Sequence, residues 1–147
     1  MKPLRMSNEG PRVRSRLGWL GTVSATVLMG LSQPAVAAGS WVAQVQGVRV
    51  IMAEREVRSA PLVAPTAVPG DATLAEVSWR YRLPPGEAVR AWLCQGEACT
   101  ALSGERGTTR AFSGGRVHEP LHFRFALMPG HKRMVQVQGL QLIAHYR

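Results

Sequence analysis

The stretch Thr-Leu-Ala-Glu-Val-Ser-Trp-Arg-Tyr-Arg-Leu at residues 73–83 decides the fold class. Apolar and polar side chains alternate along it, with the apolar set at Ala75, Val77, Trp79, Tyr81 and Leu83. A period of two is typical of a β-strand that buries one face and exposes the other. Turn-forming residues precede the stretch at 70–71 and follow it at 84–86. This stretch therefore predicts a strand with Arg80 and Arg82 on its solvent face.

The same alternation continues through the rest of the chain, and no segment shows helical periodicity. Further strands are predicted around 89–93, 100–103 and 121–127, and a short one within 54–59. Residues 60–69 contain three prolines and predict an extended loop that covers a sheet edge. Residues 103–117 are rich in Gly, Ser, Thr and Arg and predict the longest structureless segment, a candidate binding loop.

Two strands change phase part-way, one within 41–52 and one within 135–144. Their apolar positions switch between odd and even numbers at Gly47 and at Gly139. Because a one-residue slip would expose the wrong face, a β-bulge is predicted at each glycine. Long terminal strands that bend in this way suit a small antiparallel β-sandwich, here of about six to eight strands in an all-β domain.

The N-terminus predicts export. A basic segment precedes an apolar stretch at 17–31, and small residues follow at 35–39. This order is typical of a cleaved signal peptide, with cleavage after Ala37 or Ala38 and translation from Met1 or Met6. The expected organisation is a signal peptide at 1–38 and one periplasmic domain at 39–147. An uncleaved anchor is the alternative, although the apolar stretch is short for a membrane span.

The net charge of +9 overstates the basic character of the working domain. The leader carries five Lys or Arg and one Glu, a net charge of +4, so the domain carries a net charge of +5. Its arginines are scattered, often beside acids, whereas nucleic-acid binders concentrate them on one face. The sequence predicts no nucleic-acid partner, a weak attraction to anionic lipids or cell-wall polymers, and membrane contact only through an uncleaved leader.

Cys94 and Cys99 flank a predicted turn at 95–98. Cysteines that face each other at the end of a hairpin can meet disulfide geometry, and an oxidising compartment favours the bridge. A redox-active pair would normally be spaced C-x-x-C, and a zinc site needs about four ligands, whereas no histidine lies near in sequence. A structural Cys94–Cys99 disulfide is therefore expected.

No catalytic or cofactor-binding arrangement is visible in the sequence. The four histidines lack metal-ligand spacing, the serines lack a nucleophile-elbow motif, and the glycine pairs lack the Lys-Ser/Thr of a phosphate loop. We expect no cofactor, no metal and no enzymatic activity. Most aromatic residues fall on inward rows, but Trp92 falls on the outward row with Arg90. We therefore expect a partner-binding face that comprises Arg80, Arg82, Arg90 and Trp92.

Several segments, taken in order, resemble the flagellar protein FlhE family. They are Gly39-Ser40-Trp41, Val77-Ser78-Trp79-Arg80-Tyr81, Val89 to Cys94 with Cys99 to Leu102, Phe123-Arg124-Phe125 and His145-Tyr146-Arg147. The resemblance implies a periplasmic accessory protein of flagellum assembly. It further implies a chaperone-like or gating action on rod or export-gate proteins that limits proton leakage. A cell-wall module that binds peptidoglycan through Trp92 is the alternative function, and a secreted enzyme is a third.

Overall fold

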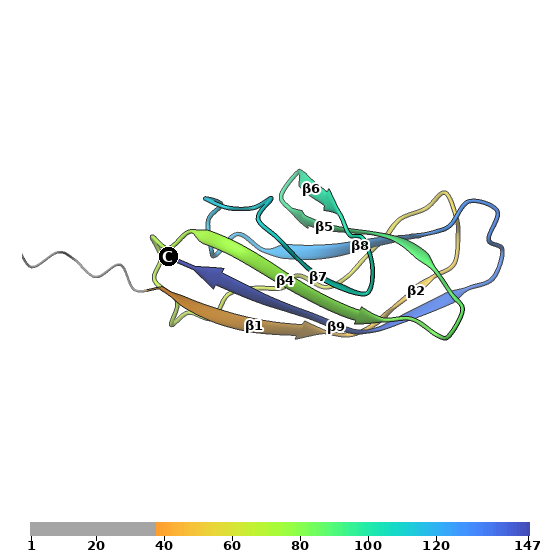
Figure 1. Cartoon of the computed structure of the whole chain (residues 1–147), viewed down its shortest axis with the longest axis horizontal. Coiled ribbons are helices and arrows are strands. Elements are labelled where there is room, and N and C mark those ends of the chain that lie inside the picture. Colours follow the sequence, from red (N-terminus) through yellow and green to blue (C-terminus); the bar gives the residue numbers. More distant parts are fainter. Residues whose placement is uncertain (1–37) are drawn as a thin grey trace, which may run out of the picture. The chain divides into compact units, whose positions relative to one another are not determined.

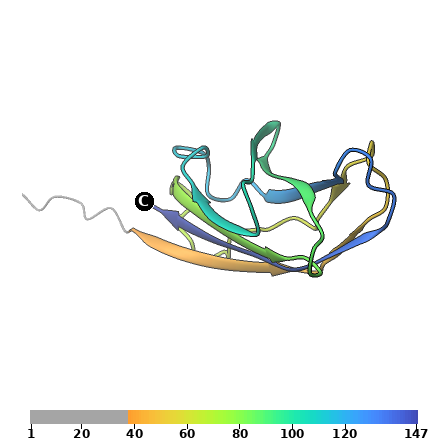
Figure 2. The same cartoon turned by 45° about the vertical axis from the view of Figure 1, so that its right-hand side comes forward.

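The computed structural model describes residues 38–147, and within them the chain is all-β. Nine strands form two antiparallel sheets that face each other as two layers (Figures 1 and 2). This confirms the expected antiparallel sandwich, with one strand more than the expected range. The expected leader at 1–38 lies outside the described residues apart from Ala38. Within the described part, no helix is long and apolar enough to cross a membrane.

The larger sheet has five strands and the smaller has four. In the five-stranded sheet the order is β1-β9-β4-β7, and β2 also pairs with β9. In the four-stranded sheet the order is β3-β8-β5-β6. The bounds are β1 Gly39–Val45, β2 Val48–Val50, β3 Val57–Arg58, β4 Leu74–Arg82, β5 Val89–Gln95, β6 Ala98–Ala101, β7 Arg106–Thr109, β8 Leu121–Leu127 and β9 Val135–Tyr146.

β4 is an interior strand of the larger sheet and matches its predicted alternation over most of its length. Val77, Trp79 and Tyr81 are buried, and the side chains between them lie on the outer face. The expected inward position at Ala75 is only half-buried, and Leu74 is buried in its place. The register between β4 and β9 shifts between Leu74 and Glu76, which changes the phase of the strand there.

An aromatic cluster joins the two sheets. The rings of Tyr81 from β4 and Phe125 from β8 meet in a T-shaped arrangement at a centroid distance of 5.2 Å. Phe123 stacks on Phe125 at 5.8 Å, and both phenylalanines are fully buried. Aromatic pairs in such geometries stabilise a core beyond the area they bury, so this cluster fixes how the two layers face each other.

The two phase switches lie beside each other in the larger sheet, because the strands that carry them are paired. β1 ends at Val45 and β2 begins at Val48, and both pair with β9 in one continuous register, from Val45 opposite Leu140 to Val48 opposite Val137. Both partners therefore change phase at the same point, and the register is kept. Relative to β4, β9 does show the expected bulge, between the partners of Arg80 and Arg82. The bulge expected at Gly47 is not found, because β1 and β2 keep one register with β9; the expected continuous strand is instead interrupted between β1 and β2.

The segment 103–117 contains a strand, contrary to the prediction that it is structureless. β7 pairs with β4 at the edge of the larger sheet, and Thr73 forms an isolated bridge with Arg116. β7 shows no apolar row because its inward positions are Gly107 and Thr109. The proline-containing segment at 60–69 does follow a sheet edge, since Leu62 bridges to Leu121 of β8.

Candidate functional site

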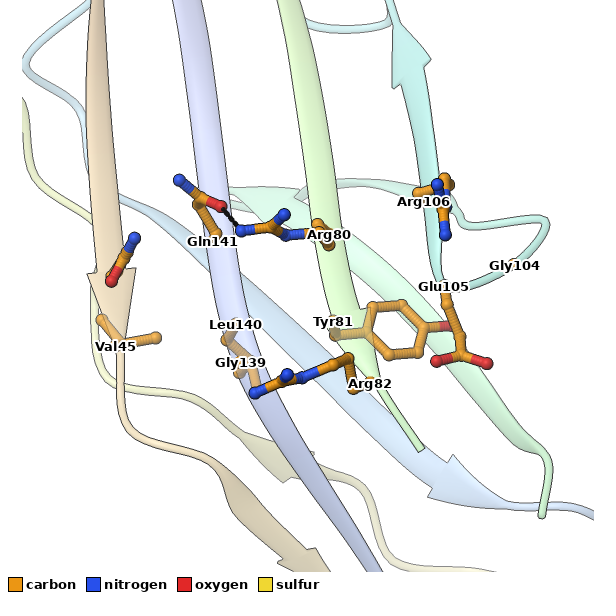
Figure 3. Close-up of a pocket in the computed structure, with 11 residues that line it drawn as sticks. Val45, Arg80, Tyr81, Arg82, Gly104, Glu105, Arg106, Gly139, Leu140 and Gln141 are labelled. Carbon is orange, nitrogen blue, oxygen red and sulfur yellow. Dashed lines mark hydrogen bonds between the residues drawn. The ribbon is translucent and has the colours of Figure 1, made fainter. Parts of the chain in front are cut away.

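The outer face of the larger sheet carries a polar row that crosses four strands. Gln44 of β1 lies opposite Gln141 of β9, which lies opposite Arg80 of β4, which lies opposite Arg106 of β7. The Arg80 guanidinium donates a hydrogen bond to the Gln141 carboxamide oxygen, as Figure 3 shows. Side chains directly opposite on one face of an antiparallel pair lie close together, so this row brings two arginines into contact range.

A groove of about 720 Å³ runs along this row (Figure 3). Its floor is formed by β4 and β9, and its sides by β1 and by the residues that lead into β7. Arg82 lies along the floor toward Gly139, where an added Cβ would stand 3.1 Å from its Nε. Gly139 has a φ of +63°, which glycine adopts without strain. The bulge at this glycine therefore leaves room for the Arg82 side chain.

The wall beside β7 is tied to β4 and to the residue after it by three hydrogen bonds. The indole Nε1 of Trp79 donates to the carbonyl oxygen of Gly104 at 3.1 Å. The backbone N–H of Tyr81 donates to the carbonyl oxygen of Glu105 at 2.8 Å, and that of Leu83 donates to the Glu105 carboxylate at 3.0 Å. Because donors from the rigid β4 strand hold both residues, the groove wall is an ordered part of the sheet.

β7 can approach this closely only because Gly107 has no side chain. A Cβ at Gly107 would lie 2.4 Å from the Trp79 ring, below any real contact distance. The Trp79 indole therefore packs where a side chain of β7 would otherwise stand. The outer position of β7 remains free for Arg106.

The groove carries more positive than negative charge. Three arginines line it, at positions 80, 82 and 106, against the single carboxylate of Glu105. None of the three forms an ion pair within 4.0 Å among residues 38–147. Like charges placed directly opposite each other destabilise a sheet, as with Arg80 and Arg106. An anion bound in the groove would relieve this repulsion.

The surroundings of Tyr81, which lies beneath the groove, shift the pKa of its phenol. Burial raises the pKa of Tyr81 to about 12, and the negative charge of Glu105 adds to the effect. The phenol is therefore neutral at physiological pH and contributes no charge to the groove. Its ring serves the aromatic core instead.

The structure divides the four residues predicted as one binding face between two faces. Arg80 and Arg82 lie in the groove, whereas Arg90 and Trp92 lie on β5, on the outer face of the other sheet. The Arg90 guanidinium lies 5.7 Å from the centre of the Trp92 ring and donates a hydrogen bond to the carbonyl oxygen of Ala53. The Arg80–Arg82 pair and the Arg90–Trp92 pair cannot contact one small partner together, because the outer faces of β4 and β5 lie on opposite sides of the sandwich.

The groove contains residues that the sequence did not single out. Arg106 itself is not named, although it falls in the segment 103–117 that the sequence predicts as a structureless candidate binding loop. Gln44 and Gln141 look like ordinary solvent-facing positions. Only the register of the sheet brings them beside Arg80. The alternation in 73–83 placed Arg80 and Arg82 on one face, and that part of the prediction is confirmed.

Cys94 and Cys99 form the disulfide that the sequence predicts. They are direct partners in the β5–β6 hairpin, with Cα atoms 4.0 Å apart. The Arg124 guanidinium approaches the Cys99 sulfur at 3.4 Å and pairs with Glu56. Beside them, His122 has no hydrogen-bond partner for its buried Nε2 among the described residues. Burial lowers the pKa of His122, and the charge of Arg58 lowers it further, while Glu97 opposes the shift.

The histidines do not gather into a metal site within residues 38–147. His118 contacts the carbonyl oxygen of Val68 at 3.0 Å, and His131 contacts the Glu87 carboxylate at 3.1 Å. These contacts give both rings a structural role in holding loops.

Comparison with known proteins places the chain in a family. The family model described as flagellar protein FlhE matches residues 47–147. The chain is 35% identical over 131 residues to the flagellar protein FlhE of Escherichia coli (strain K12), covering 86% of this chain and 98% of that protein. It is 34% identical over 128 residues to the FlhE of Salmonella typhimurium, covering 84% and 96%.

A solved structure agrees with these sequence relationships. A crystal structure described as that of FlhE superposes with a TM-score of 0.67 at 32% identity and covers 75% of this chain and 97% of its own. The family model, the relatives and the solved fold thus support the same assignment, which the ordered sequence motifs also predicted. The chain belongs to the flagellar protein FlhE family.

Proposed function

We propose that this protein is a non-enzymatic accessory factor that acts in the periplasm during flagellum assembly. Its family places its role in flagellar biology. The Cys94–Cys99 disulfide supports a location outside the cytoplasm, because such bonds persist in oxidising compartments. Export through a cleaved leader at 1–38 would bring the domain to that location.

The groove of the larger sheet is the surface that we assign to the partner. The observation that carries this assignment is the placement of Arg80, Arg82 and Arg106 side by side on an ordered face with only Glu105 to offset them. Such a face attracts and orients a partner segment that carries carboxylates. Rod or export-gate proteins with an exposed acidic segment are the partners that fit this surface. Bound to rod subunits, the protein would act as a chaperone; bound to the gate, it would limit proton leakage.

The outer edge of β1 offers a second means of holding an extended partner. β1 pairs with β9 on one side, and its other edge has no strand partner among the described residues. A segment that adds to this edge would form main-chain hydrogen bonds along up to seven residues. Strand addition would provide affinity, while the arginines of the adjacent face would select acidic segments.

Binding to purified rod and export-gate subunits tests the groove assignment. The test variant is Arg80→Glu/Arg82→Glu, and the matched control is Arg58→Glu/Arg116→Glu, which makes the same charge change away from the groove. A glutamate at position 80 would face Arg106 and relieve the like-charge repulsion, so the test variant is expected to stay folded. We expect the test variant to lose subunit binding and the control to retain it. Equal binding by both variants would eliminate the groove as the partner surface.

Trp92 supports a second candidate function, a cell-wall glycan-binding module. Its ring lies partly exposed on the outer face of the smaller sheet, and Arg90 lies beside it. Aromatic faces of this kind can stack on sugar rings. Sedimentation with purified peptidoglycan distinguishes the two functions. Retention of the protein by peptidoglycan alone, lost in Trp92→Ala and kept in Arg80→Glu/Arg82→Glu, would favour the glycan module.

A further inference from the structure

Exposed apolar side chains gather at one end of the sandwich. Ile51 and Met52 follow β2 and are 59% and 56% exposed, while Met128 and Met134, in the loop between β8 and β9, are 40% and 53% exposed. These are four of the six exposed large apolar side chains among residues 38–147. Figures 1 and 2 both place the two loops at the right-hand end of the domain. We call this group of four residues the apolar tip.

The two loops of the apolar tip are held next to each other. Val50 pairs with Val135, so Ile51, which begins the first loop, and Met134, which ends the second, leave the sheet side by side. The Arg90 guanidinium donates to the carbonyl oxygen of Ala53 at 2.8 Å, which fixes the first loop to β5. The apolar side chains are thus presented outward by anchored loops.

The second loop is fixed by a carboxylate. Glu87 contacts His131 at 3.1 Å and Arg133 at 3.3 Å, and the backbone N–H of His131 donates to the carbonyl oxygen of Met128 at 3.0 Å. The charge of Glu87 is therefore balanced by side chains of the protein itself. Glu87 also connects the loop between β4 and β5 to the loop between β8 and β9.

Positive charge surrounds the apolar tip. Arg49, Arg55, Lys132 and Arg133 are all exposed and lie on or beside the two loops. Three acids lie nearby: Glu56 pairs with Arg124, Glu87 pairs with Arg133, and Glu54 of the first loop is exposed and has no ion pair among residues 38–147. Arg49, Arg55 and Lys132 therefore outnumber the one unpaired carboxylate. Exposed Ile and Met beside an excess of Lys and Arg match the boundary of an anionic bilayer, where apolar side chains enter the acyl region and cations meet headgroup phosphates.

We propose that the apolar tip docks on the surface of a phospholipid bilayer that contains anionic lipids. None of the four side chains lines the groove assigned to the protein partner, so the two surfaces are separate. The methionines are unbranched and flexible, so they can adapt to a surface that has no fixed shape. The sequence alone predicts a weak attraction to anionic lipids and membrane contact only through an uncleaved leader, whereas the apolar tip is a defined site within the domain.

The position of the apolar tip sets the orientation of the docked domain. The C-terminus lies at the opposite end of the sandwich (Figure 1). β1 begins near it, because Gly39 pairs with Tyr146. A domain docked through the tip would stand away from the bilayer and keep the groove along its side open. Docking would thus hold the groove next to membrane-embedded or membrane-crossing assemblies.

Co-sedimentation with vesicles tests the proposal, using the exported protein purified from the periplasm. Mixed phosphatidylethanolamine and phosphatidylglycerol vesicles are compared with vesicles of phosphatidylcholine. The test variants are Ile51→Asp/Met134→Asp and Arg55→Gln/Lys132→Gln. The matched control is Val42→Asp/Val63→Asp, because these residues are equally exposed, at 52% and 51%, but belong to β1 and to the proline-containing segment.

We expect binding to the anionic vesicles that weakens with salt. Ile51→Asp/Met134→Asp should reduce it about tenfold or more, because it removes two apolar contributions and adds two like charges. Arg55→Gln/Lys132→Gln should reduce it to a lesser extent, and the control should bind as the unchanged protein does. No binding to anionic vesicles at low salt, or equal losses in the apolar variant and the control, would overturn the proposal. Loss of subunit binding in the apolar variant, with no vesicle binding by the unchanged protein, would show that the tip contacts a protein instead. Near-ultraviolet circular dichroism checks that each variant is folded.

Discussion

Gly47 and Gly139 both lie where the paired strands change phase, but each position requires glycine for a different physical reason. A Cβ at Gly47 would lie 2.3 Å from the carbonyl oxygen of Val137 and 3.2 Å from the Cα of Gln138, both in the backbone of β9. Relief requires the two strands to separate, which disturbs neighbouring ladder hydrogen bonds at about 1 kcal/mol each and adds packing strain of about 1–3 kcal/mol. Gly47→Ala is therefore expected to lower the free energy of unfolding by about 3 kcal/mol.

At Gly139 the restriction is conformational. Its φ of +63° is left-handed, and the nearest atom to an added Cβ belongs to the movable side chain of Arg82. Gly139→Ala is therefore expected to cost about 1–2 kcal/mol. Because asparagine tolerates left-handed backbone, Gly139→Asn should cost less than Gly139→Ala. Gly47→Asn should cost at least as much as Gly47→Ala, since a larger side chain meets the same backbone.

Guanidinium chloride unfolding of the oxidised protein, followed by circular dichroism, measures these four free energies. Gly70→Ala is the neutral control, because its Cβ would meet nothing within 4 Å and its φ lies outside the left-handed region. The opposite effect of asparagine at the two sites is the decisive result. If asparagine costs more than alanine at Gly139, or if Gly47→Ala is as neutral as Gly70→Ala, the paired phase switch does not have the structure described.

Three further perturbations follow from local contacts. Cys94→Ala/Cys99→Ala should lower the free energy of unfolding by about 2 kcal/mol in urea, since the closed loop is short, and a reducing agent should destabilise the unchanged protein but not this variant. Because the pKa of His122 is lowered below 6.5 in the folded state, the unfolded state binds the proton first. The free energy of unfolding should therefore be unaffected by His122 above pH 6.5 and should fall as the pH drops through the lowered folded-state pKa. In unfolding measurements across a series of pH values, His122→Gln should remove the part of this fall that His122 causes. Trp79→Phe removes the hydrogen bond to Gly104 and should cost about 1 kcal/mol, with faster amide exchange in β7; unchanged exchange there would show that the indole does not hold the groove wall.

The sequence predicted those strands in which the alternation of apolar and polar side chains shows which face is buried. β4 and β8 alternate apolar and polar residues, so their spans and faces follow from period two alone. β7 does not, because one of its inward positions is a glycine that Trp79 covers. Its place in the sheet depends on a contact with a residue far away in sequence, which local periodicity does not record.

The candidate site was predictable only in part for the same reason. Arg80 and Arg82 share a face because they are two residues apart on one strand. Whether Arg90 belongs to that face depends on which sheet β5 joins, and this is set by long-range pairing with β8. Arg106 reaches the groove only through its register with Arg80. Positions within a strand can thus be derived from sequence, whereas neighbours across strands require the topology.

Complementation of a deletion strain tests the central claim most directly, that the protein serves flagellum assembly from the periplasm through its groove. Filament number and location are counted by electron microscopy in a motile host that lacks the gene and carries either the unchanged protein, a leaderless copy, Arg80→Glu/Arg82→Glu or Arg58→Glu/Arg116→Glu. Equal periplasmic levels of the three exported forms are verified first. We predict missing or misplaced filaments in the deletion strain, restored by the unchanged protein and by the Arg58/Arg116 variant, but not by the leaderless or groove variants. Normal filaments in the deletion strain, or full restoration by the groove variant, would contradict the account.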